Sequence, residues 1–255
     1  MTTPPTKARS LLEMEPQEWQ RALKLADDDL PVAVISEGSW WRADRTKWRL
    51  SALTDVRELA FPDMFWGRWH GRPVVYCCAY GAPRAVEVAH VFGSLGAKLA
   101  IQIGTCGGLQ RELRPGDVVI PDDAVCSEGI APLYGADGVI AADTKASATA
   151  RSLMAGRSHT VHRGTHLTWY SIFAQDGPMV EDWQAQGYTS VDMETATTLA
   201  VAKHFGMAAV SMLVVWDDLL NGRSFLDPLS SQEQQHVDAG NRAVYEVALE
   251  LVDSL

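Results

Sequence analysis

A glycine-rich segment in the middle of the chain has the composition of an anion-binding turn. Gln102-Ile103-Gly104-Thr105-Cys106-Gly107-Gly108-Leu109 follows the apolar run Lys98–Ile101, so we expect a buried strand that opens into a tight turn. Glycines let the backbone N–H groups face an anion, and the Thr105 hydroxyl lies beside them. The alternative is a strand exit that binds nothing, because a single glycine-rich turn is a weak signal.

Two further segments follow downstream. They are Ser190-Val191-Asp192-Met193-Glu194-Thr195-Ala196-Thr197 and Met212-Leu213-Val214-Val215-Trp216-Asp217-Asp218. Together with the glycine-rich segment they resemble the nucleoside phosphorylase superfamily, which includes purine nucleoside phosphorylase, uridine phosphorylase and related nucleosidases. The resemblance in order and spacing extends from about Pro31 to about Asp218. It implies an α/β fold with a central mixed β-sheet flanked by helices, and cleavage of an N-glycosidic bond.

The resemblance implies a phosphate site near the end of the first strand. The superfamily places a Gly, three residues and an Arg after this strand, and Gly38 and Arg42 have that spacing. Glycine lets the backbone approach the anion, and a guanidinium group donates two parallel hydrogen bonds to phosphate oxygens. The Thr105 hydroxyl and the N–H groups of Thr105 to Gly107 would complete the site. The alternative for Arg42 is a surface side chain after a turn.

The second phosphate-binding arginine of the superfamily is replaced in this chain by Gln102, a neutral amide. A hydrogen bond to a charged group contributes roughly 1.5–3 kcal/mol and a neutral one about 1 kcal/mol, so the replacement weakens phosphate binding. Gly81-Ala82-Pro83-Arg84 resembles the Gly-x-Pro-Ser turn of the superfamily. Arg84 would therefore stand at a helix N-terminus, where it could supply the missing charge. Arg57 is a further candidate, with a surface role as the alternative.

The resemblance also implies residues for the sugar and for proton transfer to the base. Met193 and Glu194 resemble the ribose-binding pair, in which the carboxylate accepts hydrogen bonds from the 2′- and 3′-hydroxyls and the thioether packs under the sugar. Asp217 stands where purine-specific relatives keep an Asp that protonates N7 of the leaving base. The Gln-x-Arg uracil-reading signature is absent from residues 172–183. The alternatives are a carboxylate that serves a helix dipole for Glu194 and a helix cap for Asp217.

Four residues are assigned to the base site. Cys106 and Gly107 belong to the glycine-rich segment, whereas Trp169 and Phe173 lie in the region that supplies the base-stacking aromatic residue in relatives. Phe173, or Trp169 in a shifted register, would cover the face of the base. The alternative for both aromatic side chains is a place in the hydrophobic core.

Composition narrows the classes of function. A formal net charge of −10 and a pI near 5.1 argue against a broad nucleic-acid-binding surface. The four cysteines form no zinc-like pair, so we predict no metal site and reduced thiols. The sequence shows no signal peptide and no apolar run of roughly 18 residues. We therefore expect a cytoplasmic protein without a membrane partner.

Strand-like and helix-like patterns alternate along the chain and would position these residues. Near-continuous apolar runs predict strands that are buried on both faces, and amphipathic or alanine-rich runs predict helices. The expected strands are 32–35, 74–80, 99–103, 118–120 and 210–215, and the expected helices are 10–25, 85–95, 146–155, 194–205 and 232–252. Residues 1–9 are predicted to be disordered, and residues 10–255 to form a single nucleoside phosphorylase-like domain.

The sequence therefore predicts phosphorolysis of a purine nucleoside to the free base and ribose 1-phosphate. The predicted partners are a nucleoside and inorganic phosphate as co-substrate, with no cofactor, in a homo-oligomer built from dimers and as large as a hexamer. One alternative is a nucleosidase, in which water replaces phosphate, and Gln102 is the reason to retain it. The other is a non-catalytic nucleoside-binding protein on the same fold.

Overall fold

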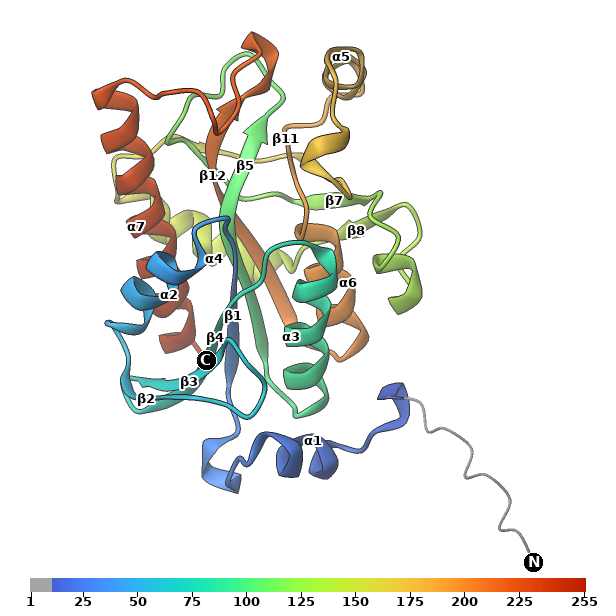
Figure 1. Ribbon diagram of the computed structural model, residues 1–255, viewed down its shortest axis with the longest axis vertical. Helices are drawn as coiled ribbons and strands as arrows, with labels where there is room; N and C mark the ends of the chain where they lie inside the picture. The colour runs from blue at the N-terminus through green and yellow to red at the C-terminus, as the bar shows by residue number, and fades with distance from the viewer. Residues whose placement is uncertain (1–10) are drawn as a thin grey trace, which may run out of the picture.

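A twelve-stranded mixed β-sheet forms the centre of the computed structural model, which describes residues 11–255 (Figure 1). The strands are β1 (Ala33–Gly38), β2 (Thr54–Glu58), β3 (Met64–Trp69), β4 (Arg72–Cys78), β5 (Leu99–Gly108), β6 (Val118–Val119), β7 (Asp123–Cys126), β8 (Val139–Ala141), β9 (Val161–His162), β10 (Thr165–Thr168), β11 (Ser190–Asp192) and β12 (Ala208–Asp218). Nine of them lie in the order β2-β3-β4-β1-β5-β11-β10-β7-β8, while β12 pairs with β5 and β6, and β6 with β9. The predicted mixed α/β class is confirmed. The predicted disorder of residues 1–9 lies outside the described residues.

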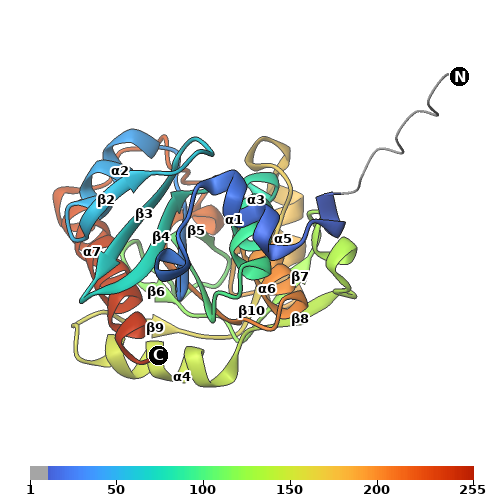
Figure 2. The same ribbon diagram turned by 90° about the horizontal axis from the view of Figure 1, so that it is seen from below.

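Helices cover both faces of this sheet (Figures 1 and 2). They are α1 (Pro16–Leu23), α2 (Arg42–Leu50), α3 (Ala82–Ser94), α4 (Thr144–Ala155), α5 (Gly177–Ala185), α6 (Thr195–His204) and α7 (Ser231–Asp253), with short 3-10 turns at η1 (Leu11–Glu13), η2 (Asp27–Asp29), η3 (Ala131–Tyr134), η4 (Ile172–Ala174) and η5 (Leu219–Asn221). Helices α1, α3 and α6 pack over one hydrophobic cluster, and α4 and α7 over another. Successive strand residues alternate between the clusters: Val34 belongs to the first and Ile35 to the second. Near-continuous apolar strands are the consequence.

Strand β5 lies at the centre of the sheet, and one short stretch of one of its edges has no neighbouring strand. Its first edge pairs with β12 along its whole length. On its other edge β1 runs parallel up to Gly38 opposite Gly104, and β11 runs antiparallel opposite Gly107 and Gly108. Because β1 and β11 run in opposite directions along the same edge of β5, their carboxyl ends approach each other at Thr105. The segments that follow both strands therefore meet over the same residues of β5.

The predicted elements are present, but several boundaries were wrong. The glycine-rich segment is not a turn, because β5 continues through Gly108, where two neighbouring strands satisfy its backbone. The helix expected over 10–25 begins at Pro16, whose fixed φ angle suits the first helical turn, and ends at Leu23. Helices α2 and α5 and seven strands, β2, β3 and β7 to β11, were not predicted. Among residues 11–255, no helix has the length and apolar character to cross a membrane.

A buried ion pair holds the last turn of α2, the helix that follows β1, against the sheet. Arg49 is fully buried and donates to both carboxylate oxygens of Glu37 at 2.8 and 3.0 Å. Its third nitrogen donates to the Asn241 carbonyl in α7 at 2.9 Å, and the Tyr76 hydroxyl donates to Glu37 at 2.8 Å. These bonds tie α2, β1, β4 and α7 together. The helix that follows the loop after β1 is therefore held against the sheet.

Candidate active site

The ends of β1, β5, β11 and β12 enclose a pocket of about 70 Å³. The structure brings seven of the predicted site residues to its wall: Gly38, Thr105, Cys106, Gly107, Met193, Glu194 and Asp217. The other lining residues are Tyr80, Ile172, Gln175, Val191, Asp192 and Leu219. No Lys, Arg or His of residues 11–255 is among these lining residues. The pocket therefore combines three carboxyl groups with apolar and backbone surface.

Glu194 lies at the junction of the two strand ends and is almost completely buried. Its carboxylate accepts hydrogen bonds from the N–H groups of Gly81 and Met193, the latter at 3.3 Å. A Cβ atom at Gly38 would stand only 2.7 Å from Glu194 Oε2. Gly38 is thus required for the position of this carboxylate. This is a second reason for a glycine here, besides the close approach of an anion to the backbone. Burial and the neighbouring charge of Asp192 raise the pKa of Glu194 to about 8.

A buried polar network lies beneath Glu194 and includes Gln102. The Gln102 amide donates to Asp192 Oδ2 at 3.0 Å and accepts from the hydroxyls of Thr195, at 2.8 Å, and Ser211. Gln102 is 1% exposed and does not line the pocket. The prediction that it stands in the phosphate site is therefore not supported. Its place in the fold is to hold Asp192 and the first residue of α6.

Asp192 is the ionised member of this network. Its Oδ1 lies 2.8 Å from His166 Nε2, an ion-pair distance, and accepts from Thr168 Oγ1 at 3.1 Å. Burial alone would raise the pKa of Asp192, but His166 and the hydrogen bonds of Thr195 outweigh it and lower the pKa. Asp192 is therefore an anion, and the neighbouring carboxyl group of Glu194 is largely protonated.

Asp217 lines the pocket from the other edge of β5, where β12 pairs. It follows an irregularity in the pairing of β12 with β5, between Val215 and Asp217, which turns the end of the strand toward the pocket. Its Oδ1 is buried and has no hydrogen-bond partner among the described residues. Burial, then the charge of Asp227, raise the pKa of Asp217 to about 7. A carboxyl group with this pKa can give a proton to a ligand near neutral pH.

Tyr80 lines the pocket, and Arg42 lies close enough to act electrostatically on its phenol. Burial and the charges of Glu194 and Asp217 raise the pKa of the Tyr80 phenol, while the charge of Arg42 acts in the opposite direction. Arg42 is the first residue of α2 and is exposed. It makes no hydrogen bond or ion pair with another residue of the described chain. Arg42 is therefore an exposed cation near Tyr80 and does not line the pocket.

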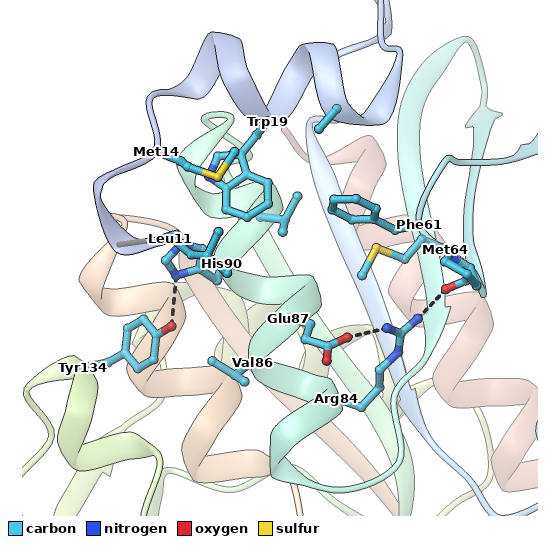
Figure 3. Close-up of a pocket in the computed structure, with 13 residues that line it drawn as sticks. Leu11, Met14, Trp19, Phe61, Met64, Arg84, Val86, Glu87, His90 and Tyr134 are labelled. Carbon is cyan, nitrogen blue, oxygen red and sulfur yellow. Dashed lines mark hydrogen bonds and ion pairs between the residues drawn. The ribbon is translucent and has the colours of Figure 1, made fainter. Parts of the chain in front are cut away.

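The structure does not bring Arg84 to this pocket. Arg84 pairs with Glu87 and donates to the Pro62 carbonyl at 2.6 Å (Figure 3). There it lines a separate, mainly apolar cavity of about 590 Å³ together with Trp19, Phe61 and other residues. The helix N-terminus that was expected to present Arg84 instead directs the Gly81 N–H at Glu194. The expected compensation for Gln102 is absent from this pocket.

The aromatic residues around the pocket differ from those predicted. Trp169 donates to the Ala174 carbonyl at 3.0 Å and packs on Trp183 at 5.1 Å, so it is a partly buried residue against a hydrophobic cluster and does not line the pocket. Phe173 is 82% exposed and does not line the pocket, whereas its neighbour Ile172 does. Tyr80 was missed, although its place at the end of an apolar run before Gly81-Ala82-Pro83 was a usable signal.

A sequence model of the phosphorylase superfamily matches residues 51–252. The chain belongs to this superfamily. The match includes all the predicted site residues except Gly38 and Arg42, which precede it. Among residues 11–255, no group of three or more His, Cys, Asp or Glu side chains is arranged to hold a metal ion.

The chain is similar to superfamily members that are named for different nucleosides. The DeoD-type purine nucleoside phosphorylase of Geobacillus kaustophilus (strain HTA426) is 31% identical over 162 residues, which are 62% of this chain and 68% of that protein. The guanosine phosphorylase of Halorubrum lacusprofundi is 23% identical over 209 residues, which are 80% of this chain and 85% of that protein. A crystal structure of uridine phosphorylase from Vibrio fischeri ES114 has a TM-score of 0.77, with 20% identity, and covers 91% of this chain and 95% of that one. The structural likeness shows the shared fold.

Proposed function

We propose that this protein cleaves the N-glycosidic bond of a purine nucleoside by phosphorolysis and releases the free base and ribose 1-phosphate. The observation that carries the proposal is the pair of carboxyl groups that line one pocket from opposite edges of β5, since Glu194 follows β11 and Asp217 belongs to β12. Asp217 has an unpartnered Oδ1 and a pKa near 7, and Glu194 is held by two backbone N–H groups. Proton transfer to a leaving base and binding of sugar hydroxyls need groups of these two kinds.

In this arrangement the ribose lies over Met193 with its hydroxyls at Glu194, and the base lies toward Asp217. Asp217 protonates N7 as the bond to C1′ breaks, so the base leaves as a neutral molecule. The sugar then acquires positive charge. The ionised Asp192 lies at the same pocket and stabilises that charge electrostatically in a site shielded from water.

Phosphate would reach C1′ from the face opposite the base. Arg42 near Tyr80, the Thr105 hydroxyl and the backbone at Gly38 are the groups available to hold it. The open edge of β5 at Thr105, between the ends of β1 and β11, supports this placement, because its backbone groups there face no neighbouring strand on that side. A single exposed arginine gives a weaker phosphate site than two buried ones would.

Hydrolysis by water is the second candidate, and one observation favours it. Within the described part of the chain, no Lys, Arg or His side chain lines the pocket, whereas three carboxyl groups do. The ionised Asp192 makes the potential there unfavourable for an anionic nucleophile, whereas a water molecule carries no charge to be repelled. The same sugar and base contacts would serve both reactions.

Incubation with adenosine, inosine, guanosine and uridine, with and without phosphate, tests the proposal. We expect purine nucleosides to be cleaved only when phosphate is present, with ribose 1-phosphate as product. Arg42→Ala should raise the KM for phosphate by roughly tenfold or more, the effect of losing one charged hydrogen-bond donor. Arg84→Ala is the matched control, since Arg84 lies in the other cavity. Free ribose at an equal rate without phosphate would establish the hydrolase instead.

A further inference from the structure

A second cavity opens from the candidate active site beside Asp217. It shares four lining residues with the first pocket: Tyr80, Thr105, Ile172 and Asp217. Its remaining wall consists of four aromatic side chains, Trp40, Trp41, Trp216 and Phe225, and we call this space of about 50 Å³ the aromatic lobe. Glu194 and Met193 do not line it. The lobe therefore continues the pocket on the side away from the proposed ribose position.

The aromatic wall is assembled from three separate parts of the chain. Trp41 stacks on Trp216 with ring centroids 5.1 Å apart, and Trp40 lies 5.6 Å from Phe225. Trp40 also makes an edge contact with Tyr80 at 5.4 Å. Trp40 and Trp41 follow β1, Trp216 belongs to β12, and Phe225 lies in the segment between η5 and α7. The fold gathers these rings next to Asp217, so the cluster does not arise from one aromatic-rich stretch.

Core packing does not account for this cluster. Trp40 and Trp41 remain 47% and 43% exposed, which leaves a large apolar surface in contact with water. Trp216 Nε1 is buried and, like Asp217 Oδ1, has no hydrogen-bond partner among residues 11–255. No charged side chain other than Asp217 lines the lobe. Stacked indole rings with little polar surface suit a flat apolar group.

We propose that the aromatic lobe binds a planar apolar substituent at C6 of the purine, which makes 6-substituted purine nucleosides the preferred substrate class. The inference rests on the proposed function, in which Asp217 contacts N7. In a purine, the substituent at C6 lies on the same edge as N7 and points away from the sugar. A substituent at C8 points back toward the sugar, and so toward Glu194. The lobe adjoins Asp217 and excludes Glu194, which matches the C6 direction.

Ligand entry requires movement of the aromatic side chains. The pocket and the lobe hold about 70 and 50 Å³, below the roughly 300–1,000 Å³ of a typical ligand site. Trp40 and Phe225 both lie outside helices and strands. No hydrogen bond holds the Trp40 indole to another residue of the described chain. These two rings are the ones that can turn outward and then close over a bound substituent.

Two paired comparisons test the lobe. The first is kcat/KM for N6-benzyladenosine against adenosine, and the second is calorimetric binding of N6-benzyladenine against adenine. Wild type should prefer the benzyl compounds by roughly tenfold or more in both, since even one methylene group in an apolar pocket contributes about 10–200-fold. Trp40→Ala and Phe225→Ala should each reduce that preference to about twofold or less. Leu226→Ala, which changes an 80% exposed neighbour that lines neither cavity, should retain it.

The two measurements separate failure of this inference from failure of the proposed function. Cleavage of adenosine without a benzyl preference, or a preference that survives both substitutions, would overturn the lobe. A benzyl preference in binding that depends on Trp40 and Phe225, without cleavage of any nucleoside, would support the lobe and refute the proposed reaction. Because Trp40 and Phe225 lie on different segments, the test still works if one of the two variants fails to fold.

Discussion

Replacement of Asp217 by Asn tests the proton-transfer step, because it retains the shape of the side chain and removes its acid. The ordinary aspartate pKa of 3.8 is raised here to about 7 by burial and by Asp227. At pH 7 about half of the molecules then carry a protonated Asp217, compared with fewer than about one in a thousand for an unshifted aspartate. General acid catalysis contributes roughly 10²–10⁴-fold, so the variant should lose at least about 10²-fold in kcat on inosine, or about 2.7 kcal/mol.

The dependence of kcat/KM on pH shows which protonation state of Asp217 is active. The protonated form of Asp217 is the active one, so wild-type kcat/KM should be high below pH 7 and fall as the pH rises above about 7. In Asp217→Asn the rate should be low and this limb should be absent. A limb near pH 8 should remain in both proteins, because Glu194 titrates there.

A substrate that needs no proton provides the control for Asp217→Asn. 7-Methylguanosine already carries a positive charge on its imidazole ring, so its base leaves without protonation at N7. Steady-state rates on inosine and on 7-methylguanosine, measured with both proteins, should show a large loss on the first and a loss of less than about tenfold on the second. Equal losses on the two substrates would show that Asp217 acts through structure, and no loss on inosine would remove it from the mechanism.

Four further predictions concern the sugar site and its supports. Glu194→Gln should impair cleavage of ribosides more than of 2′-deoxyribosides in a rate comparison, because part of its role is at the 2′-hydroxyl; equal losses would assign it to the 3′-hydroxyl or to structure. Burial raises the pKa of Glu194 from 4.5 to about 8, so the folded state favours its protonated form. The free energy of unfolding, measured in urea, should therefore fall as the pH rises from about 4.5 to 8, by at most about 5 kcal/mol. The fall should be smaller in Glu194→Gln, which has no carboxyl group to titrate. Gly38→Ala should raise the KM for nucleoside, because its Cβ would stand 2.7 Å from Glu194 Oε2, and an unchanged KM would show that the carboxylate is free to move. Arg49→Met should cost roughly 3–5 kcal/mol in urea unfolding, because it leaves Glu37 buried without its partner, and a loss below about 1 kcal/mol would contradict that reasoning.

The sequence predicts which segments meet at the site better than where side chains point. The first strand and the three motifs place Gly38, Thr105, Glu194 and Asp217 after or within apolar runs, and the structure brings these four residues to one pocket. That agreement has a physical reason, since strand ends in one sheet gather at a few places. The motif alone did not show that Gly38 is also needed to make room for Glu194.

Side-chain direction depended on partners that are distant in sequence. Alternation along β5 puts Gln102 on the face opposite Ile101 and Ile103, but its enclosure by Asp192 and Thr195 arises only when β11 and α6 pack there. Arg84 is turned away by a nearby carboxylate and by a carbonyl 22 residues upstream. The aromatic lobe depends on contacts between residues 40–41, 216 and 225, which no local pattern links.

The most direct test of the central claim is a crystal structure with a purine C-nucleoside, whose base cannot leave. We expect the sugar hydroxyls to contact Glu194 and N7 to lie about 2.7–3.2 Å from Asp217 Oδ1, the buried oxygen that has no partner within residues 11–255. A nucleoside bound with its base at Glu194, or one bound only in the cavity beside Arg84, would contradict it.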